Sequence, residues 1–201
     1  MRATLWSDYL CPWCYVGQHR DGLLAELGFT VEHLPYELHP DIPPAGTRVR
    51  SDGRLRPTLD RVEAECEAVG MPFRRPTRMP NTRRALATAE WVRREHPAAF
   101  AAVHRALFAA QFVTGDPLDD PEALDAIVAG AGAPADEVRA AVDAGLAEPF
   151  IDESMARARE VGVASTPTWL VGEMALPGIF DEATFRRWAT RLAARAAEHP
   201  H

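Results

Sequence analysis

Cys11 and Cys14 are the residues whose types and spacing predict chemistry. They follow a short apolar run of strand type, residues 3–6, and they precede residues 16–27, whose apolar side chains repeat with helical spacing. Cys11 is therefore expected at the start of a helix, where Pro12 suits the first position because its missing N–H costs no hydrogen bond there. The free backbone donors and the dipole of the first turn favour a thiolate at Cys11. Cys14 lies one turn further on, within reach of a disulfide with Cys11.

The chain has a third cysteine, Cys66. In a reducing compartment a close cysteine pair is more typical of redox catalysis or metal binding than of a structural disulfide. A closed zinc site needs about four ligands, and the histidines show no spacing that would supply a second pair. We therefore expect redox chemistry and no bound metal. Cys66 lies in a predicted helix far from the pair in sequence, and we interpret it as a small core residue.

The composition limits the partners and the compartment. The 201 residues carry a formal net charge of −7, which argues against nucleic-acid binding, because nucleic-acid binders present a basic patch. No apolar run approaches the roughly 20 residues of a membrane helix, so no membrane association is predicted. The first predicted strand begins near residue 2, which leaves no room for a signal peptide, and we expect a cytoplasmic protein.

The predicted elements alternate between strand and helix at both ends of the chain. Both strands before residue 40 are expected to lie parallel in one sheet, because a helix connects them. Asn81 and Asp120 are expected to cap helices in the middle of the chain. The expected elements are a strand over 2–7, a helix over 11–27 ended by Gly28, a strand over 30–38, an exposed loop over 41–57, helices throughout 58–161, hairpin strands over 168–171 and 174–178, and a final helix capped by Asp181.

This order of elements with a Cys-Pro-Trp-Cys helix start resembles the DsbA-like branch of the thioredoxin superfamily. Four motifs in the same order resemble its FrnE-type cytoplasmic members, and they are Ser7-Asp8 with Cys11–Gly17, Tyr36–Pro40, Asn81-Thr82 and Ser165–Thr168. The resemblance covers nearly the whole chain. It implies an α/β thioredoxin-like fold with an inserted all-helical subdomain. Residues 1–40 and 162–201 would form the thioredoxin-like domain, and residues 41–161 the inserted loop and helical subdomain.

The resemblance also implies that Cys11 is the attacking thiol, that Cys14 is the resolving thiol, and that Pro167 is a cis proline beside them. Disulfide exchange needs a thiolate that reaches a substrate sulfur and a second thiol that breaks the mixed disulfide, and the two cysteines meet that need independently of the resemblance. With a cis bond at Pro167, Thr166 is expected to offer main-chain groups to an extended substrate.

Three further residues are expected to act beside the pair. Pro12 and Trp13 are expected to contact the substrate and to set the redox poise. Because Trp13 brings no positive charge, we predict a Cys11 pKa below the value of about 8.5 for a free cysteine and above the value of about 3.5 for DsbA. Asp8 can relay a proton for Cys14 or cap the turn, and the sequence leaves both roles open.

Three functions remain as hypotheses. The first is a cytoplasmic thiol–disulfide oxidoreductase that acts on a thiol- or disulfide-containing protein or small molecule, with no bound cofactor and with glutathione as a candidate reductant or co-substrate. The second is a glutathione-dependent isomerase or transferase of the 2-hydroxychromene-2-carboxylate isomerase or kappa-class type, acting on a small aromatic or polyketide substrate. Those enzymes usually carry Ser in place of the first Cys, so the pair favours the first hypothesis. The third is a binding or chaperone-like module. The substrate, the direction of electron flow, and the choice between monomer and homodimer stay open.

Overall fold

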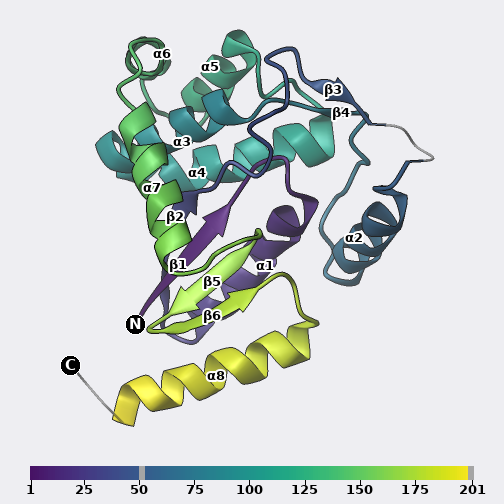
Figure 1. The fold of residues 1–201 in the computed structure, drawn as a ribbon, viewed down its shortest axis with the longest axis vertical. Coiled ribbons are helices and arrows are strands. Elements are labelled where there is room, and N and C mark those ends of the chain that lie inside the picture. The colour runs from purple at the N-terminus through teal and green to yellow at the C-terminus, as the bar shows by residue number, and fades with distance from the viewer. Residues whose placement is uncertain (50–52, 199–201) are drawn as a thin grey trace.

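The structure is a computed structural model that describes residues 1–49 and 53–198. Residues 50–52 of the expected loop and residues 199–201 of the expected thioredoxin-like domain lie outside the described residues. The longer strands lie toward both ends of the chain, and a run of helices fills the middle (Figure 1). The strands are β1 (Arg2–Ser7), β2 (Thr30–Pro35), β3 (Thr47–Arg48), β4 (Arg78–Met79), β5 (Thr168–Val171) and β6 (Met174–Pro177). The helices are α1 (Pro12–Glu26), α2 (Arg56–Ala68), α3 (Arg83–Glu95), α4 (Pro97–Ala109), α5 (Pro121–Gly130), α6 (Ala135–Asp143), α7 (Glu148–Glu160) and α8 (Glu182–Glu198).

The central sheet has four strands in the order β2-β1-β5-β6. β1 and β2 are parallel, as expected for strands joined by a helix, whereas β5 runs antiparallel to both β1 and β6. Side chains of α1 and α8, among them Leu24 and Phe185, pack on the Leu5 and Trp169 side of the sheet. On the other side Trp6 packs against α7. The sheet is therefore the middle layer between helices.

Helices α3 to α6 lie together above the sheet in Figure 1, α7 runs from this group down along the sheet, and α2 stands apart at the right. Their buried side chains form one hydrophobic cluster that also contains Cys11, Cys14 and Val16 from the start of α1. The chain thus has a mixed α/β thioredoxin-like fold with an inserted helical subdomain. The exact boundaries of 1–40 and 162–201 against 41–161 stay a prediction. Among the described residues, no helix combines the length and the apolar character that a membrane span requires.

The second strand is shorter than expected. β2 ends at Pro35, not at residue 38, although the Tyr36 N–H still donates to the Ser7 carbonyl oxygen at 2.9 Å. Beyond it the Leu38 N–H donates to Asp8 Oδ2 at 2.7 Å. The carboxylate at the end of β1 therefore draws residues 37–38 out of the sheet and toward α1.

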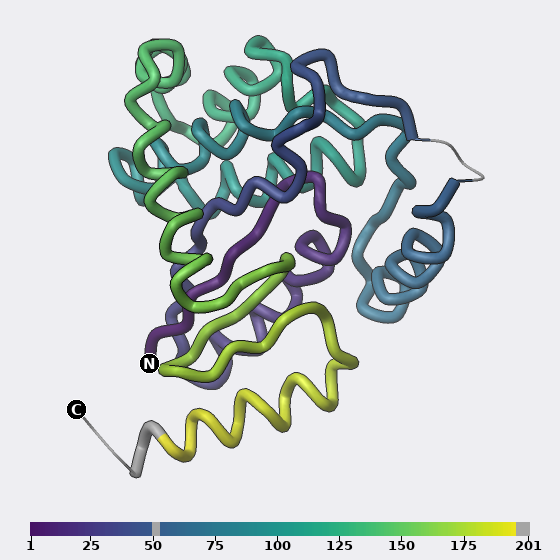
Figure 2. Tube along the Cα trace, viewed as in Figure 1, coloured from purple at the N-terminus to yellow at the C-terminus, as the bar shows by residue number. Residues whose placement is uncertain are grey.

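The prediction of helices throughout 58–161 was wrong for residues 71–80. α2 already begins at Arg56 and ends before Gly70, whose φ of +70° lies in the left-handed region. An extended segment with β4 follows. Prolines at 72, 76 and 80 lack the backbone N–H that a helix interior needs, and the stretches between them are too short to form a helix. In the tube view the chain passes from β2 along the helical subdomain to α2 and returns through this segment to α3 (Figure 2).

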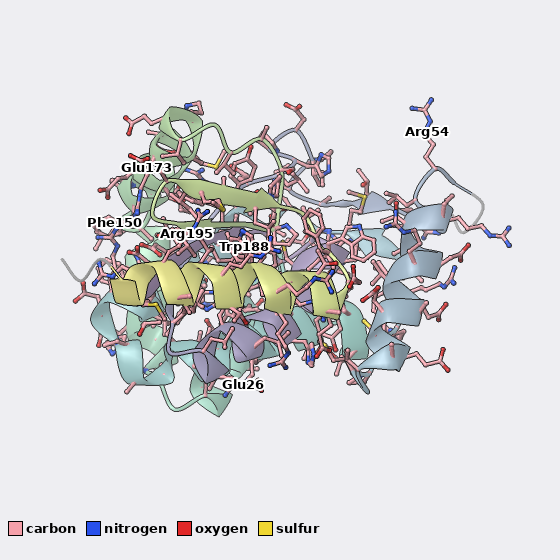
Figure 3. All side chains as sticks on the ribbon, turned by 90° about the horizontal axis from the view of Figure 1, so that it is seen from below. Glu26, Arg54, Phe150, Glu173, Trp188 and Arg195 are labelled. Atoms are coloured by element: carbon pink, nitrogen blue, oxygen red, sulfur yellow. The ribbon has the colours of Figure 1, made fainter. Side chains whose placement is uncertain are left out.

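Several local predictions are confirmed. Asp120 caps α5 by accepting from the Glu122 N–H, and Asp181 Oδ1 accepts from the Thr184 N–H at the start of α8. Gly28 has a φ of +81° just after α1, and the β5–β6 hairpin turns at Gly172. Figure 3 shows α8 lying across the molecule, and it also shows Arg54, from the expected exposed loop, pointing away from the body.

Candidate active site

The start of α1 holds both cysteines of the close pair. Cys11 is the N-cap of α1, with extended backbone angles, and Pro12 occupies the first helical turn. The Cys11 N–H donates to the Asp8 carbonyl oxygen at 3.1 Å, and the Cys14 N–H donates to the Cys11 carbonyl oxygen at 3.0 Å. Both sulfurs belong to free thiols and each residue is only 3% exposed. The turn therefore presents a dithiol at the end of β1, where the helix begins.

The pKa of the Cys11 thiol is lowered, in the direction predicted from the sequence. The largest cause is a hydrogen bond from the Cys14 thiol to the Cys11 sulfur; burial opposes it, and the Thr166 hydroxyl and the Cys14 backbone N–H lower the pKa further. The negative charge of Asp8 raises it. Hydrogen bonds to the charged form therefore outweigh burial at Cys11.

The pKa of the Cys14 thiol is raised well above its ordinary value. Burial is the largest cause, and the hydrogen bond that Cys14 donates to Cys11, together with the charge of Cys11, adds to it. A thiolate on Cys11 and a protonated Cys14 therefore stabilise each other. The surroundings therefore shift the pKa values of the two thiols in opposite directions, although the side chains are identical.

Asp8 is completely buried beside the pair. Its Oδ1 accepts from the Leu10 N–H at 3.2 Å and its Oδ2 accepts from the Leu38 N–H at 2.7 Å. Burial is the largest influence on its pKa and raises it to about 6, although these hydrogen bonds and one from Thr82 oppose the rise. The carboxylate holds the turn that carries Cys11 and the segment that follows β2, so both of its expected roles keep a physical basis.

The loop before β5 faces the pair from the opposite side. The Thr166–Pro167 peptide bond is cis, as the resemblance implied. The Cys11 Sγ lies 3.5 Å from the Thr166 carbonyl oxygen, to which the thiol donates. The Thr166 hydroxyl is buried and has no hydrogen-bond partner among residues 1–49 and 53–198, so it is free to donate to a thiolate on Cys11. Pro167 lies behind this contact, against Gly17 of α1.

A cavity of about 240 Å³ opens beside Cys11. Pro12 and Trp13 line it from the start of α1, and Ser165 and Thr166 line it from the cis-proline loop. The Arg61 guanidinium of α2 lies 5.2 Å from the centre of the Trp13 ring, so a positive charge does lie near the pair, although it comes from another helix. The structure therefore brings together every site residue expected from the sequence.

Other walls of the cavity were not expected. They come from segments far away in sequence: Val49 and Leu55 before α2, Leu59 inside α2, Met79 of β4, and Gln111. Gln111 lies in a π-helical turn over Ala110–Thr114 that extends α4. The amphipathic spacing of α2 marks Leu59 as an inward residue, whereas no local pattern indicates the π-helical turn or the direction of Val49.

Two residues in or near the motifs contribute to packing or structure, and a third lines the cavity. Tyr15 is buried among Phe73, Phe108 and Phe112 and donates to the Pro72 carbonyl oxygen, so it is not part of the cavity wall. Asn81 Nδ2 donates to the Ile42 carbonyl oxygen at 2.7 Å, and its Oδ1 accepts from Arg83 at the start of α3. His39 lines the cavity.

Cys66 lies in α2 and is 1% exposed in the same cluster as Val62. Burial is the main cause that raises the pKa of its thiol to about 11, and Glu65 and Glu63 add to it. The thiol is therefore protonated near neutral pH, as a core residue would be. In the part of the chain that the structure describes, no three His, Cys, Asp or Glu side chains gather in a way that would hold a metal ion.

Solved structures with the same fold span nearly the full length of the chain. The probable DsbA oxidoreductase SCO1869 from Streptomyces coelicolor is 24% identical with a TM-score of 0.83, over 96% of this chain and 90% of that one. A 2-hydroxychromene-2-carboxylate isomerase is 21% identical with a TM-score of 0.78, over 98% of both chains. The cytosolic disulfide reductase DsbM from Pseudomonas aeruginosa, solved with GSH, is 16% identical with a TM-score of 0.66, over 98% of both chains.

No curated protein matches the chain. A family model, described as a DSBA-like thioredoxin domain, matches residues 3–188. This match includes the cysteine pair, the inserted helices, the cis-proline loop and the first part of the last helix. The chain therefore belongs to the DSBA-like thioredoxin domain family.

Proposed function

We propose that the protein is a thiol–disulfide oxidoreductase in which Cys11 attacks and Cys14 resolves. The observation that carries this proposal is the opposite perturbation of two thiols one helical turn apart, with the pKa of Cys11 lowered and that of Cys14 raised. The nucleophile of disulfide exchange is a thiolate, and the resolving thiol must wait until a mixed disulfide has formed. The hydrogen bond from Cys14 to Cys11 supplies this order.

The reaction starts with the Cys11 thiolate, which attacks one sulfur of a substrate disulfide and releases the other as a thiolate. A mixed disulfide then joins Cys11 to the substrate. Cys14 loses its proton and attacks Cys11, which releases the second substrate thiolate and leaves a Cys11–Cys14 disulfide. Two electrons pass from the dithiol to the substrate, and the released thiolates take up protons from water according to their pKa. The same steps in reverse oxidise a substrate dithiol.

We propose three roles for the surroundings of the pair. Thr166 stabilises the Cys11 thiolate through its hydroxyl, and Pro12, Trp13 and Pro167 shape the side from which the substrate sulfur arrives. Asp8 acts as a cap for the turn, since each of its oxygens accepts a backbone N–H, and this role accounts for its position without a proton relay. The relay remains testable through the rate of the Asp8→Asn variant.

We further propose a FrnE-type protein of the cytoplasm that uses no bound cofactor or metal and is reduced by glutathione or a similar small thiol. The four sequence motifs support the FrnE type. The cytosolic disulfide reductase DsbM, solved with GSH, shares the fold and supports the compartment and the reductant. The partners would be thiols or disulfides, and neither nucleic acid nor a membrane. A monomer and a homodimer fit this proposal equally.

The test is an equilibrium titration of the protein in buffers of reduced and oxidised glutathione, with the Cys11–Cys14 bond measured by mass. We expect interconversion between dithiol and disulfide at potentials between those of DsbA and thioredoxin, about −120 and −270 mV. The Cys14→Ala variant should accumulate a mixed disulfide on Cys11 after exposure to oxidised glutathione. A protein that stays a dithiol at every such potential would refute the proposal.

A second candidate is a glutathione-dependent isomerase or transferase that acts on a small aromatic or polyketide substrate. The specific observation in its favour is the similarity to a 2-hydroxychromene-2-carboxylate isomerase over 98% of both chains. Such an enzyme uses glutathione as a bound group and needs no resolving thiol. The Cys14→Ala variant separates the candidates, because it should stop catalytic disulfide exchange and leave isomerisation or transfer at its full rate.

A further inference from the structure

The cavity beside Cys11 has a size and a lining that restrict what it can bind. Its volume of about 240 Å³ lies below the range typical of sites for drug-sized ligands. Leu10, Trp13, Leu38, Val49, Leu55 and Leu59 contribute apolar side chains to it. No Asp, Glu, Lys or Arg side chain is among the described residues that line it. The cavity therefore favours a compact, uncharged group.

The inserted segments close the cavity around Cys11. The start of α1 and the Ser165-Thr166 loop form one side. The walls that a thioredoxin-like sheet with its helices would not supply come from Val49, Leu55, Thr58, Leu59 and Met79. Cys11 itself is 3% exposed. A substrate sulfur must therefore enter the cavity to reach it, and whatever is bonded to that sulfur must fit within these walls.

The cis-proline loop leaves few main-chain acceptors for an extended polypeptide. The Ser165 carbonyl oxygen accepts from the Thr168 hydroxyl at 2.7 Å, and the Pro167 carbonyl oxygen accepts from the Gly178 N–H at 2.7 Å. The Thr166 carbonyl oxygen accepts from the Cys11 thiol and is released when Cys11 loses its proton. A polypeptide that binds as an added strand needs a series of free backbone groups, and two of the three carbonyl oxygens in this loop already accept a hydrogen bond from the chain itself.

From these features we infer that the substrate is a low-molecular-weight disulfide whose sulfur carries an apolar group of about one aromatic ring. This inference rests on the proposed function and adds the substrate class to it. The apolar group fills the cavity between Trp13 and Leu59, and its sulfur faces Cys11. The reduced protein supplies two electrons: Cys11 bonds to the sulfur of the apolar half, the other half leaves as a thiolate, and Cys14 then releases the apolar thiolate and closes the Cys11–Cys14 disulfide.

The test compares single-turnover rates of the reduced protein with two small disulfides, benzyl 2-hydroxyethyl disulfide and bis(2-hydroxyethyl) disulfide. Insulin serves as a protein disulfide. Each rate constant is divided by that of dithiothreitol with the same disulfide, which removes differences in intrinsic reactivity. We expect the benzyl compound to react at least about tenfold faster than the polar one, which corresponds to about 1.4 kcal/mol. The reason is that its aromatic ring moves out of water and into the apolar cavity. Insulin should react more slowly than either compound.

Leu55 offers a variant that changes the wall and leaves the pair intact. It is 39% exposed, so the protein should tolerate Leu55→Asn, and this change should reduce the benzyl preference at least about threefold because it makes one wall polar. Leu146 is 51% exposed in the segment between α6 and α7 and does not line the cavity. The matched control Leu146→Asn should therefore keep the full preference.

An unreactive thioether separates a failure of this inference from a failure of the proposed function. Benzyl 2-hydroxyethyl sulfide has no disulfide bond, and its binding is measured by calorimetry against bis(2-hydroxyethyl) sulfide. If the benzyl thioether binds more tightly and no disulfide is reduced, the cavity assignment stands for an apolar ligand and the oxidoreductase function is refuted. If disulfides are reduced without a benzyl preference, or if insulin reacts fastest, the inference is overturned and the oxidoreductase function stands.

Discussion

The hydroxyl of Thr166 can be removed with little change in packing, because valine has nearly the same shape. This hydroxyl is one of the groups that lower the pKa of Cys11, and it has no other hydrogen-bond partner among the described residues. Hydrogen bonds to charged groups contribute about 1.5–3 kcal/mol, and a sulfur acceptor places this one near the lower end. One pKa unit corresponds to about 1.36 kcal/mol. Thr166→Val should therefore raise the pKa of Cys11 by about one pH unit.

The assay is the pH dependence of alkylation of the reduced protein by iodoacetamide, together with the ultraviolet absorbance of the thiolate. The lowest titration belongs to Cys11, because the pKa of Cys66 is about 11 and that of Cys14 is raised well above its ordinary value. The free energy of unfolding should not fall in Thr166→Val, since the hydroxyl is buried without such a partner. An unchanged or lower Cys11 pKa would refute the role of the hydroxyl.

A matched control is Thr88→Val in α3. Thr88 is buried, as Thr166 is, but it is not among the groups that shift the pKa of Cys11. Its substitution should leave the alkylation profile where it is in the unchanged protein. A similar rise in both variants would indicate a general change in packing and not the loss of one hydrogen bond.

Two further predictions concern Asp8 and Cys66. Because burial raises the pKa of Asp8 from 3.8 to about 6, the folded protein binds more protons than the unfolded chain, so Asp8 lowers the free energy of unfolding as the pH rises from about 4 to about 6, by about 3 kcal/mol at most. His33 and His104 have lowered pKa values and titrate with the opposite sign, so the measurement is the difference in denaturant unfolding between the protein and Asp8→Asn at each pH, and a difference that does not change with pH would contradict the assignment. Cys66→Ala should cost about 1 kcal/mol of stability and leave the rate of disulfide exchange unchanged, and a slower exchange at equal stability would show that Cys66 takes part in the chemistry.

The parts of the site that lie within one short stretch could be predicted from the sequence. Cys11 and Pro12 start α1 because a helix start needs neither the proline N–H nor an intrahelical partner for its first donors. The caps at Asp120 and Asp181 were predictable for the same reason, since their side chains satisfy donors of the first turn. These features depend on neighbouring residues only.

The walls of the cavity could not be predicted, because they depend on contacts between distant segments. Leu38 is drawn toward Cys11 by the buried carboxylate of Asp8, and nothing in residues 36–38 themselves indicates this turn. Arg61 reaches Trp13 from α2, so the prediction from Trp13, which itself brings no positive charge, did not include this cation. Tertiary contacts of this kind override local preference.

The cysteine pair shares its hydrophobic cluster with the inserted helices, as Leu86, Leu107 and Phe108 pack in the same group as Cys11 and Cys14. The insert is therefore not a detachable module. A shortened chain that kept only the sheet, α1 and α8 would lose the helical side chains that pack around Cys11 and Cys14. Water would then reach both thiols, which are buried in the full chain. A shorter version of this protein must therefore retain the inserted helices as well as the cysteine pair.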